Sequence, residues 1–212
     1  MENDRHKQQM VSASSALPGR TTAVAVPDEH YVTGNDMQTP FPLGIEQAMF
    51  AMGPFWLPEF LYWQQDGIYA TAVGYAGGYT PNPNAEEVAS SQTGHTEVVL
   101  VAFDSSEISY RRLLKIFWEC HNPTQGMRQG EHVGTQYRSA IFCFDNDQLQ
   151  QAEESLAHYQ KRLAEKGFGD ITTAVEMAPE FYYAEAEQQQ YLAKNPDCDI
   201  ELDGTGVKIQ WG

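Results

Sequence analysis

Short apolar runs separated by turn residues are the feature that most constrains how this chain can fold. Five runs rich in β-branched or aromatic residues have the character of strands: 48–52, 68–75, 98–103, 139–144 and 172–177. The first ends at Gly53, and the second is closed by Gly77 and Gly78. We therefore predict five short strands.

Two segments between these runs have the pattern of helices. The first, over residues 109–118, begins with Ser109, a good helix cap, and is largely apolar. In the second, from Asp147 to Lys166, apolar residues recur at steps of three and four, which places them on one face: Leu149, Ala152, Leu156, Tyr159 and Leu163. Strands interleaved with helices indicate an α/β domain, specifically a two-layer α+β sandwich.

Composition and charge limit the organisation and the partners of the chain. Residues 1–45 are rich in Gln, Ser, Thr, Pro and Gly, so we predict a flexible or extended leader before a single domain over residues 46–212.

The formal net charge of −16 argues against binding to nucleic acid or to an anionic membrane surface. No run approaches the roughly 18 to 20 apolar residues that span a bilayer, and the N-terminus lacks the apolar part of a secretory signal. We expect a cytoplasmic monomer.

The cysteines and histidines show no pattern of a disulfide framework or a metal site. Cys120, Cys143 and Cys198 form neither a CxxC pair nor an even set. We expect Cys120 and Cys143 to be small buried apolar residues. The six histidines and 29 acidic residues have no recognised spacing of metal ligands. We predict no metal and no cofactor.

Five motifs follow one another along roughly residues 45 to 210. They are Ala51-Met52-Gly53-Pro54-Phe55-Trp56, Gly77-Gly78-Tyr79-Thr80-Pro81-Asn82-Pro83, Thr93-Gly94-His95-Thr96-Glu97, Gln129-Gly130 with Gly134-Thr135-Gln136-Tyr137-Arg138-Ser139, and Phe181-Tyr182-Tyr183-Ala184-Glu185 through Gln189-Gln190-Tyr191 to Lys194-Asn195-Pro196. In this order they resemble the motifs of the peptide methionine sulfoxide reductase A family. The resemblance implies a ferredoxin-like core with extended N-terminal and C-terminal segments.

The resemblance also implies a pocket for a methyl sulfoxide. Phe55 and Trp56 correspond to the family's aromatic box for the methyl group, while Glu97, Tyr79 and Tyr137 correspond to the groups that hold the sulfoxide oxygen. That oxygen must gain protons as the S–O bond breaks, and burial keeps a carboxyl protonated near neutral pH. Phenol hydroxyls can donate hydrogen bonds to the developing charge.

These residues also have ordinary structural interpretations. Phe55 and Trp56 could be core aromatics, and Tyr79, which lies in a loop rich in Gly and Pro, could simply cap a turn. A buried carboxylate at Glu97 is costly without a partner, which favours either a function or a hydrogen bond there.

The chain departs from the family pattern at four places. Pro54 occupies the position of the nucleophilic cysteine, which in the family lies at a helix N-terminus. Pro58 would remove the first hydrogen bond of a helix beginning at Pro54, at a cost of ~3 kcal/mol, so we expect the helix to begin at Pro58 and residues 53–57 to be unwound.

His132 replaces an aspartate and could be a new acid or base, or an exposed loop residue. Ile200 and Lys208 stand where the recycling cysteines are expected, with Cys198 two residues earlier.

Proline carries no electron pair that could attack sulfur, so we predict that thiol-based reduction of methionine sulfoxide is absent. In this hypothesis the pocket binds a methionine-containing, sulfoxide-like or other small polar ligand, and Glu97, Tyr79, Tyr137 and His132 perform repurposed acid–base chemistry. One alternative is a non-catalytic pseudoenzyme with a partner-binding or regulatory role. Another is a residual peptide-methionine (S)-S-oxide reductase that uses a different thiol, such as Cys198.

Overall fold

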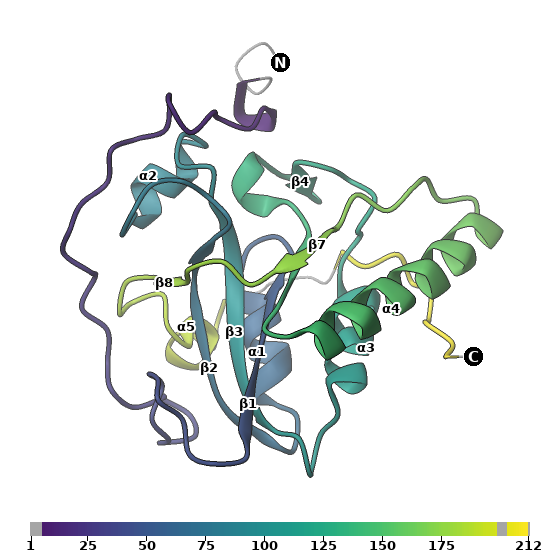
Figure 1. Ribbon diagram of the computed structural model, residues 1–212, viewed down its shortest axis with the longest axis horizontal. Coiled ribbons are helices and arrows are strands. Elements are labelled where there is room, and N and C mark those ends of the chain that lie inside the picture. The colour runs from purple at the N-terminus through teal and green to yellow at the C-terminus, as the bar shows by residue number, and fades with distance from the viewer. Residues whose placement is uncertain (1–5, 199–202, 212) are drawn as a thin grey trace.

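The structure, a computed structural model, describes residues 6–198 and 203–211 and is built on one mixed sheet (Figure 1). The strand order is β7-β6-β1-β3-β2-β8. The strands are β1 (Ile45–Ala51), β2 (Ile68–Ala76), β3 (Thr96–Asp104), β6 (Ala140–Cys143), β7 (Ala174–Met177) and β8 (Tyr182–Tyr183). Neighbouring strands are antiparallel except β6 and β7, which are parallel.

The central part of the sheet has the ferredoxin-like arrangement. Helix α1 (Trp56–Trp63) joins β1 to β2, and α3 (Tyr110–Cys120) joins β3 to β6. Because β3 lies between β1 and β2, this is the split βαβ topology. The α/β fold, the five strands and the two helices expected from the sequence are therefore confirmed.

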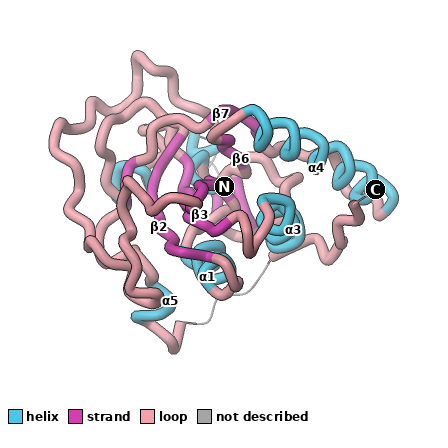
Figure 2. Tube along the Cα trace, turned by 60° about the horizontal axis from the view of Figure 1, so that its bottom comes forward, coloured by secondary structure: helices cyan, strands magenta, loops and turns pink. Residues whose placement is uncertain are grey.

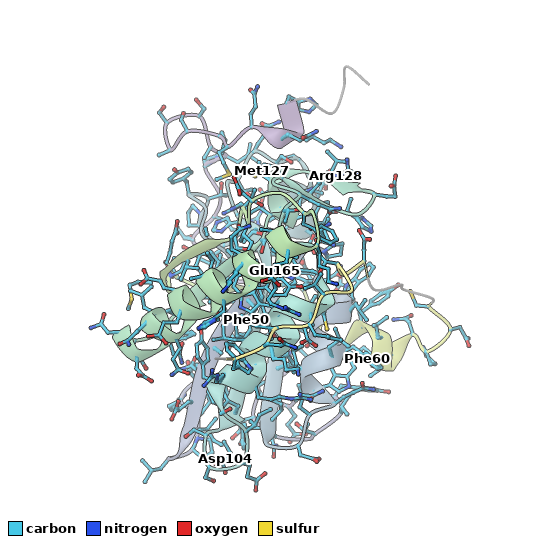
Figure 3. The ribbon with its side chains drawn as sticks, turned by 90° about the vertical axis from the view of Figure 1, so that its right-hand side faces the viewer. Phe50, Phe60, Asp104, Met127, Arg128 and Glu165 are labelled. Atoms are coloured by element: carbon cyan, nitrogen blue, oxygen red, sulfur yellow. The ribbon has the colours of Figure 1, made fainter. Side chains whose placement is uncertain are left out.

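The helices cover one face of the sheet. α4 (Asn146–Glu165) packs beside α3 and near the β6–β7 edge (Figure 2). Residues from α1, α3 and α4 form one core with the facing strand residues, among them Phe50, which lies in the middle of the molecule in Figure 3. Phe50 stacks on Tyr62 of α1 with ring centroids 5.2 Å apart. The expected two layers are thus a sheet and a helical layer.

The opposite face of the sheet carries a second apolar cluster, which includes Met49, Leu100 and Phe142. No helix covers this cluster in the described part of the chain. Met37, only 1% exposed, packs into it from the N-terminal segment, and Val26 and Phe181 pack at its margin. The N-terminal segment therefore contributes to the core.

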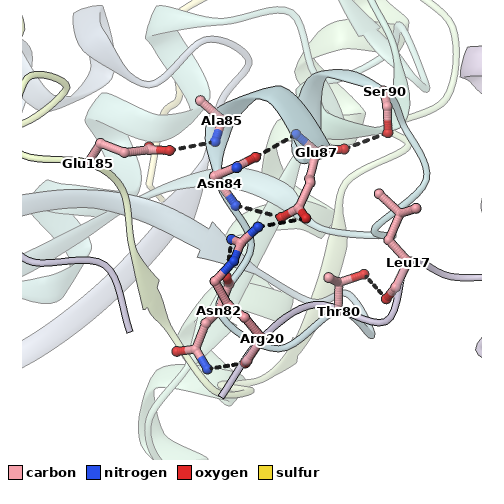
Figure 4. A network of polar contacts seen from close by, with 9 residues as sticks. All are labelled: Leu17, Arg20, Thr80, Asn82, Asn84, Ala85, Glu87, Ser90 and Glu185. Carbon is pink, nitrogen blue, oxygen red and sulfur yellow. Dashed lines mark hydrogen bonds and ion pairs between the residues drawn. The ribbon is translucent and has the colours of Figure 1, made fainter. Parts of the chain in front are cut away.

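The N-terminal segment runs along the outside of the molecule as an extended wrap (Figure 1). Arg20 donates to Glu87 Oε1 and to the carbonyl oxygen of Asn82, each at 2.7 Å (Figure 4). Glu87 belongs to α2 (Ala85–Ala89), whose first turn is closed by a capping box between Asn84 and Glu87. The flexibility of this leader and its boundary with the domain stay predictions.

Helix α1 begins at Trp56, which corrects the expectation that it begins at Pro58. The first helical hydrogen bond runs from the Glu59 amide to the Phe55 carbonyl oxygen, at 2.9 Å. Pro58 is the third residue of the helix, where an amide has no acceptor within the helix. The proline therefore removes no hydrogen bond, and only residues 53–55 lie outside the helix.

The remaining elements are short. The hairpin of β4 (Arg128–Gln129) and β5 (His132–Val133) precedes a 3₁₀ turn (Thr135–Tyr137), and α5 (Tyr191–Lys194) lies near the C-terminus. Another 3₁₀ turn spans His6–Gln8. In Figure 3 Arg128 lies at the opposite end of the molecule from Asp104, the last residue of β3. Within the described residues, no helix is long and apolar enough to cross a membrane.

Candidate functional site

A hollow of about 560 Å³ opens beside the turn between β1 and α1. Its lining residues from this turn and α1 are Pro54, Trp56, Leu57, Pro58 and Leu61, and those from other parts of the chain include Cys120, His132, Cys198 and Asp203. Gly53 permits the sharp turn, since its φ is +88° and a Cβ there would lie 2.6 Å from the Gln129 side chain. The hollow is therefore shaped by the first family motif and the hairpin.

The two aromatic residues of that motif have different environments. Trp56 lines the hollow, donates its Nε1–H to Gln188 Oε1 at 2.9 Å and stacks on Tyr191 at 4.1 Å. Phe55 is 4% exposed and packs in the core against Tyr75, with ring centroids 5.9 Å apart. Trp56 is thus placed to contact a ligand in the hollow, whereas Phe55 supports the turn from behind.

Glu97 lies directly behind the turn. Its Oε2 accepts the Phe55 amide at 3.1 Å, and burial raises its pKa to about 8, against the smaller lowering effect of that hydrogen bond. A carboxyl in this state holds a proton at neutral pH. Burial, with a further contribution from the Glu97 charge, also raises the pKa of Tyr137. The effect of the Glu97 charge on Tyr137 indicates that these two side chains lie near each other, and their role as proton donors stays a prediction.

The structure does not bring Tyr79 to this pair. Its side chain is 52% exposed, and a Cβ on Gly94 would lie 3.1 Å from its ring. Tyr79 follows the turn at Gly77, whose φ is +73°, and its amide donates to the Thr93 carbonyl oxygen at 2.9 Å. The tyrosine that lies beside Glu97 is Tyr75, its directly opposite partner on β2. Its hydroxyl donates to Glu185 Oε2 at 3.1 Å.

His132 lies in the hairpin at the rim of the hollow. Its ring is exposed, and the centroid lies 5.3 Å from that of Tyr137. Both interpretations of this residue thus have a basis, since it is a loop histidine that also lines the hollow. Within the described residues, no group of three or more His, Cys, Asp or Glu could hold a metal ion.

The thiols differ from the expectation at one position. Cys143 is buried, 3.9 Å from the Tyr110 hydroxyl, as expected. Cys120 is only partly buried and lines the hollow at the end of α3, where burial raises the pKa of its thiol. Cys198 lines the same hollow and is exposed. Of the two positions expected for recycling cysteines, Lys208 pairs with Glu119 at 3.0 Å, and Ile200 lies outside the described residues.

Sequence reasoning missed several residues around the site. Tyr75 is the last residue of an apolar run and looked like an ordinary strand residue, although its register opposite Glu97 marks it as a neighbour. Gln188 and Tyr191 hold the Trp56 indole from the C-terminal segment. The motif Gln189-Gln190-Tyr191 was the only signal in the sequence that could have found them.

The fold and the site define a ferredoxin-like α/β protein with a hollow lined by Trp56 and a carboxyl of raised pKa bonded to the turn beside it. The chain belongs to the peptide methionine sulfoxide reductase family, whose model matches residues 46–208.

Curated relatives and solved structures agree with this assignment. A peptide methionine sulfoxide reductase MsrA from Azotobacter vinelandii is 57% identical over 95% of this chain and 94% of its own. MsrA 1 from Synechocystis is 56% identical over 97% of this chain and 93% of its own. The structure of methionine sulfoxide reductase A from Corynebacterium diphtheriae has a TM-score of 0.85 at 38% identity and covers 96% of this chain and 100% of its own.

These relatives overturn the functional prediction made from Pro54. We expected a pocket without thiol-based reductase activity, repurposed for another ligand or for a regulatory role. Proteins 56% to 57% identical over nearly the whole chain are named as reductases, which favours ordinary reductase function. The prediction of a repurposed or non-catalytic protein is therefore wrong, because it gave one position more weight than the rest of the sequence.

Proposed function

We propose that this protein reduces methionine sulfoxide in peptides to methionine. Pro54 stands where the resemblance places the nucleophile and has no sulfur. The two electrons that reduce the sulfoxide must therefore come from another residue. The observation that supports the proposal is the composition of the hollow: Cys120 and Cys198 line it together with Trp56. A sulfoxide held against the Trp56 indole would thus have two thiols within the same cavity.

Exposure favours Cys198 as the attacking thiol. It is solvent-accessible, whereas burial raises the pKa of the Cys120 thiol and disfavours its reactive thiolate. Cys120 is better suited to the second step, in which a thiol condenses with an oxidised partner. The hollow would thus hold both an attacking thiol and a resolving thiol.

The reaction balances with these groups. The Cys198 thiolate attacks the sulfoxide sulfur, the S–O bond breaks, and oxygen passes to cysteine, giving methionine and a sulfenic acid. Glu97, protonated because its pKa is about 8, supplies the proton that the departing oxygen needs. Cys120 then condenses with the sulfenic acid, which releases water and forms a disulfide. An external dithiol reduces that disulfide for the next cycle.

Four residues complete the proposed site. Tyr137 donates a hydrogen bond to the sulfoxide oxygen, and Trp56 contacts the methyl group, with Phe55 behind it. His132, which lines the hollow and lies beside the Tyr137 ring, is the fourth. We further propose that the protein acts as a monomer in the cytoplasm on methionine sulfoxide peptides.

A single-turnover assay tests this proposal. The reduced full chain is mixed with a sub-stoichiometric methionine (S)-sulfoxide peptide without added reductant, and both are analysed by mass spectrometry. We expect loss of oxygen from the peptide and a disulfide between Cys120 and Cys198. The variant Cys198→Ser should convert nothing, and Cys120→Ser should convert all of the sub-stoichiometric peptide and leave a sulfenic acid that dimedone traps.

Cys143→Ser provides the matched control, because it removes a buried thiol outside the hollow and should leave turnover unchanged. The protein is produced in a host that lacks its own methionine sulfoxide reductases. Absence of conversion by the folded wild-type chain would refute the proposed activity. Conversion by Cys198→Ser would refute the assignment of the attacking thiol.

A further inference from the structure

A buried polar cluster lies behind the Trp56 wall and has no part in the chemistry proposed above. Its members Glu59, Thr71 and Gln190 are each at most 1% exposed. Glu59, three residues after Trp56 in α1, accepts three hydrogen bonds: from Thr71 Oγ1 at 3.1 Å, the Gln190 amide at 2.9 Å and Gln190 Nε2 at 2.7 Å. Through these bonds the Glu59 carboxyl connects α1 to β2, which carries Thr71, and to the C-terminal segment, which carries Gln190.

The N-terminal segment joins the cluster through His30. Its Nδ1 accepts the amides of Val32 and Thr33 at 3.2 and 3.1 Å, so Nε2 carries the proton. Nε2 lies 2.9 Å from Thr71 Oγ1, whose own proton goes to Glu59. His30 is therefore a neutral donor, and burial lowers its pKa to about 4. The cluster has a defined hydrogen-bond direction that ends on Glu59.

Four consecutive residues of the C-terminal segment each make a specific contact with α1 or β2. Gln188 accepts the Trp56 indole N–H, and Tyr191 stacks on the same indole. Between them, the Gln189 side chain bonds to the Val73 amide and carbonyl, both at 2.8 Å. Gln190 binds Glu59. The two residues that hold the indole thus flank the two that anchor the segment.

The backbone of Gln190 shows that this anchoring is specific. Its φ is +46°, a left-handed conformation that is uncommon for residues other than glycine. Such a conformation persists where surrounding contacts determine it. Glu59 supplies two of these contacts, one to the amide and one to the side chain of Gln190.

We propose that Glu59 is a positioning residue that fixes the Trp56 indole as the wall of the hollow. It acts through Gln190, which anchors the segment, and then through Gln188 and Tyr191, which hold the indole on its nitrogen and its face. A wall already ordered before the substrate arrives lowers the entropy cost of binding. This inference rests on the proposed function only in naming a methionine sulfoxide peptide as the substrate.

The variant Glu59→Gln tests the inference with a readout that needs no turnover. A glutamine amide nitrogen cannot accept a hydrogen bond, so at least one donor of Gln190 or Thr71 loses its acceptor. The chain has four tryptophans, so the ¹⁵N–¹H spectrum of the protein contains four indole resonances. We expect the Trp56 resonance, assigned with Trp56→Phe, to broaden or shift, and that of Trp118 to stay in place. The KM for the peptide should rise by about five- to tenfold with kcat changed less than about twofold.

Ser155→Ala is the matched control, because Ser155 accepts the Trp118 indole N–H at 2.8 Å in another buried part of the core. It should move the Trp118 resonance and leave Trp56 and KM unchanged. Should Glu59→Gln fail to fold, Gln190→Leu removes one of the three hydrogen bonds and should give a smaller effect of the same kind.

An unchanged Trp56 resonance in the folded variant would overturn the inference. Equal changes at Trp56 and Trp118 would also overturn it, because they indicate general loosening. The resonances are read on the free protein, so absence of turnover in the wild type would count against the proposed function and not against this role of Glu59.

Discussion

At the scale of single residues, Glu97 is a partly exposed residue beside the turn that precedes α1. Burial raises its pKa to about 8, and its oxygen already accepts the Phe55 amide. The variant Glu97→Gln keeps an acceptor for that amide but has no proton to give. We expect reductase turnover to fall by about 10²-fold, the usual contribution of a general acid.

The pH profile separates this role from a structural one. In the wild type, turnover should decline as pH rises through about 8, because Glu97 loses its proton there. The variant should lack this decline, and measuring kcat across this range checks it. A variant with wild-type activity, or one that keeps the same alkaline decline, would exclude Glu97 as the proton donor.

At the scale of elements, replacing Pro58 tests whether this proline stabilises or strains the first turn of α1. Because it lies in the first turn, it removes no helical hydrogen bond, and its ring restricts the unfolded chain. Pro58 is also buried. Replacing it by alanine should lower the free energy of unfolding by about 1 to 2 kcal/mol, measured by urea denaturation. A more stable variant would mean that the proline strains the helix.

The elements that local patterns define were predicted, and those that distant contacts define were not. The 20-residue α4 follows from its apolar periodicity, and α3 from its cap at Ser109 and its apolar content. The two-residue strand β8 exists because Tyr182 pairs with Tyr75 of β2, and no local signal reveals such a pairing. In the same way, the motifs suggested Trp56, Glu97 and Tyr137, but the place of Tyr75 opposite Glu97 depends on strand register.

At the scale of the whole molecule, the pH dependence of stability depends on two carboxyls and three histidines, of which His95 has its pKa lowered by burial. Glu59 and Glu97 have their pKa raised from 4.5 to about 8, so between these values only the folded state holds their protons and stability falls with pH. His30 and His121 have their pKa lowered from 6.5 to about 4, so stability rises with pH between these values. The two effects oppose each other below pH 6.5, and above it only the carboxyl effect remains.

We therefore expect the free energy of unfolding not to fall from pH 4.5 to 6.5, where the histidines offset the carboxyls, and to fall from 6.5 to 8. Each carboxyl contributes on the order of 1 kcal/mol per pH unit in the upper range. Urea denaturation across this range measures the slope, which Glu97→Gln should reduce by about half. A slope that is flat or positive above pH 6.5 would contradict this assignment.

The N-terminal segment has a practical consequence for anyone who trims this protein to the length of the family match. Met37 packs against the sheet face that carries Met49, Leu100 and Phe142, and covers part of it. A fragment that begins at β1 would expose this apolar surface to water, and the fragment would tend to aggregate. Preparations intended for crystallisation should therefore retain the residues that precede the first strand.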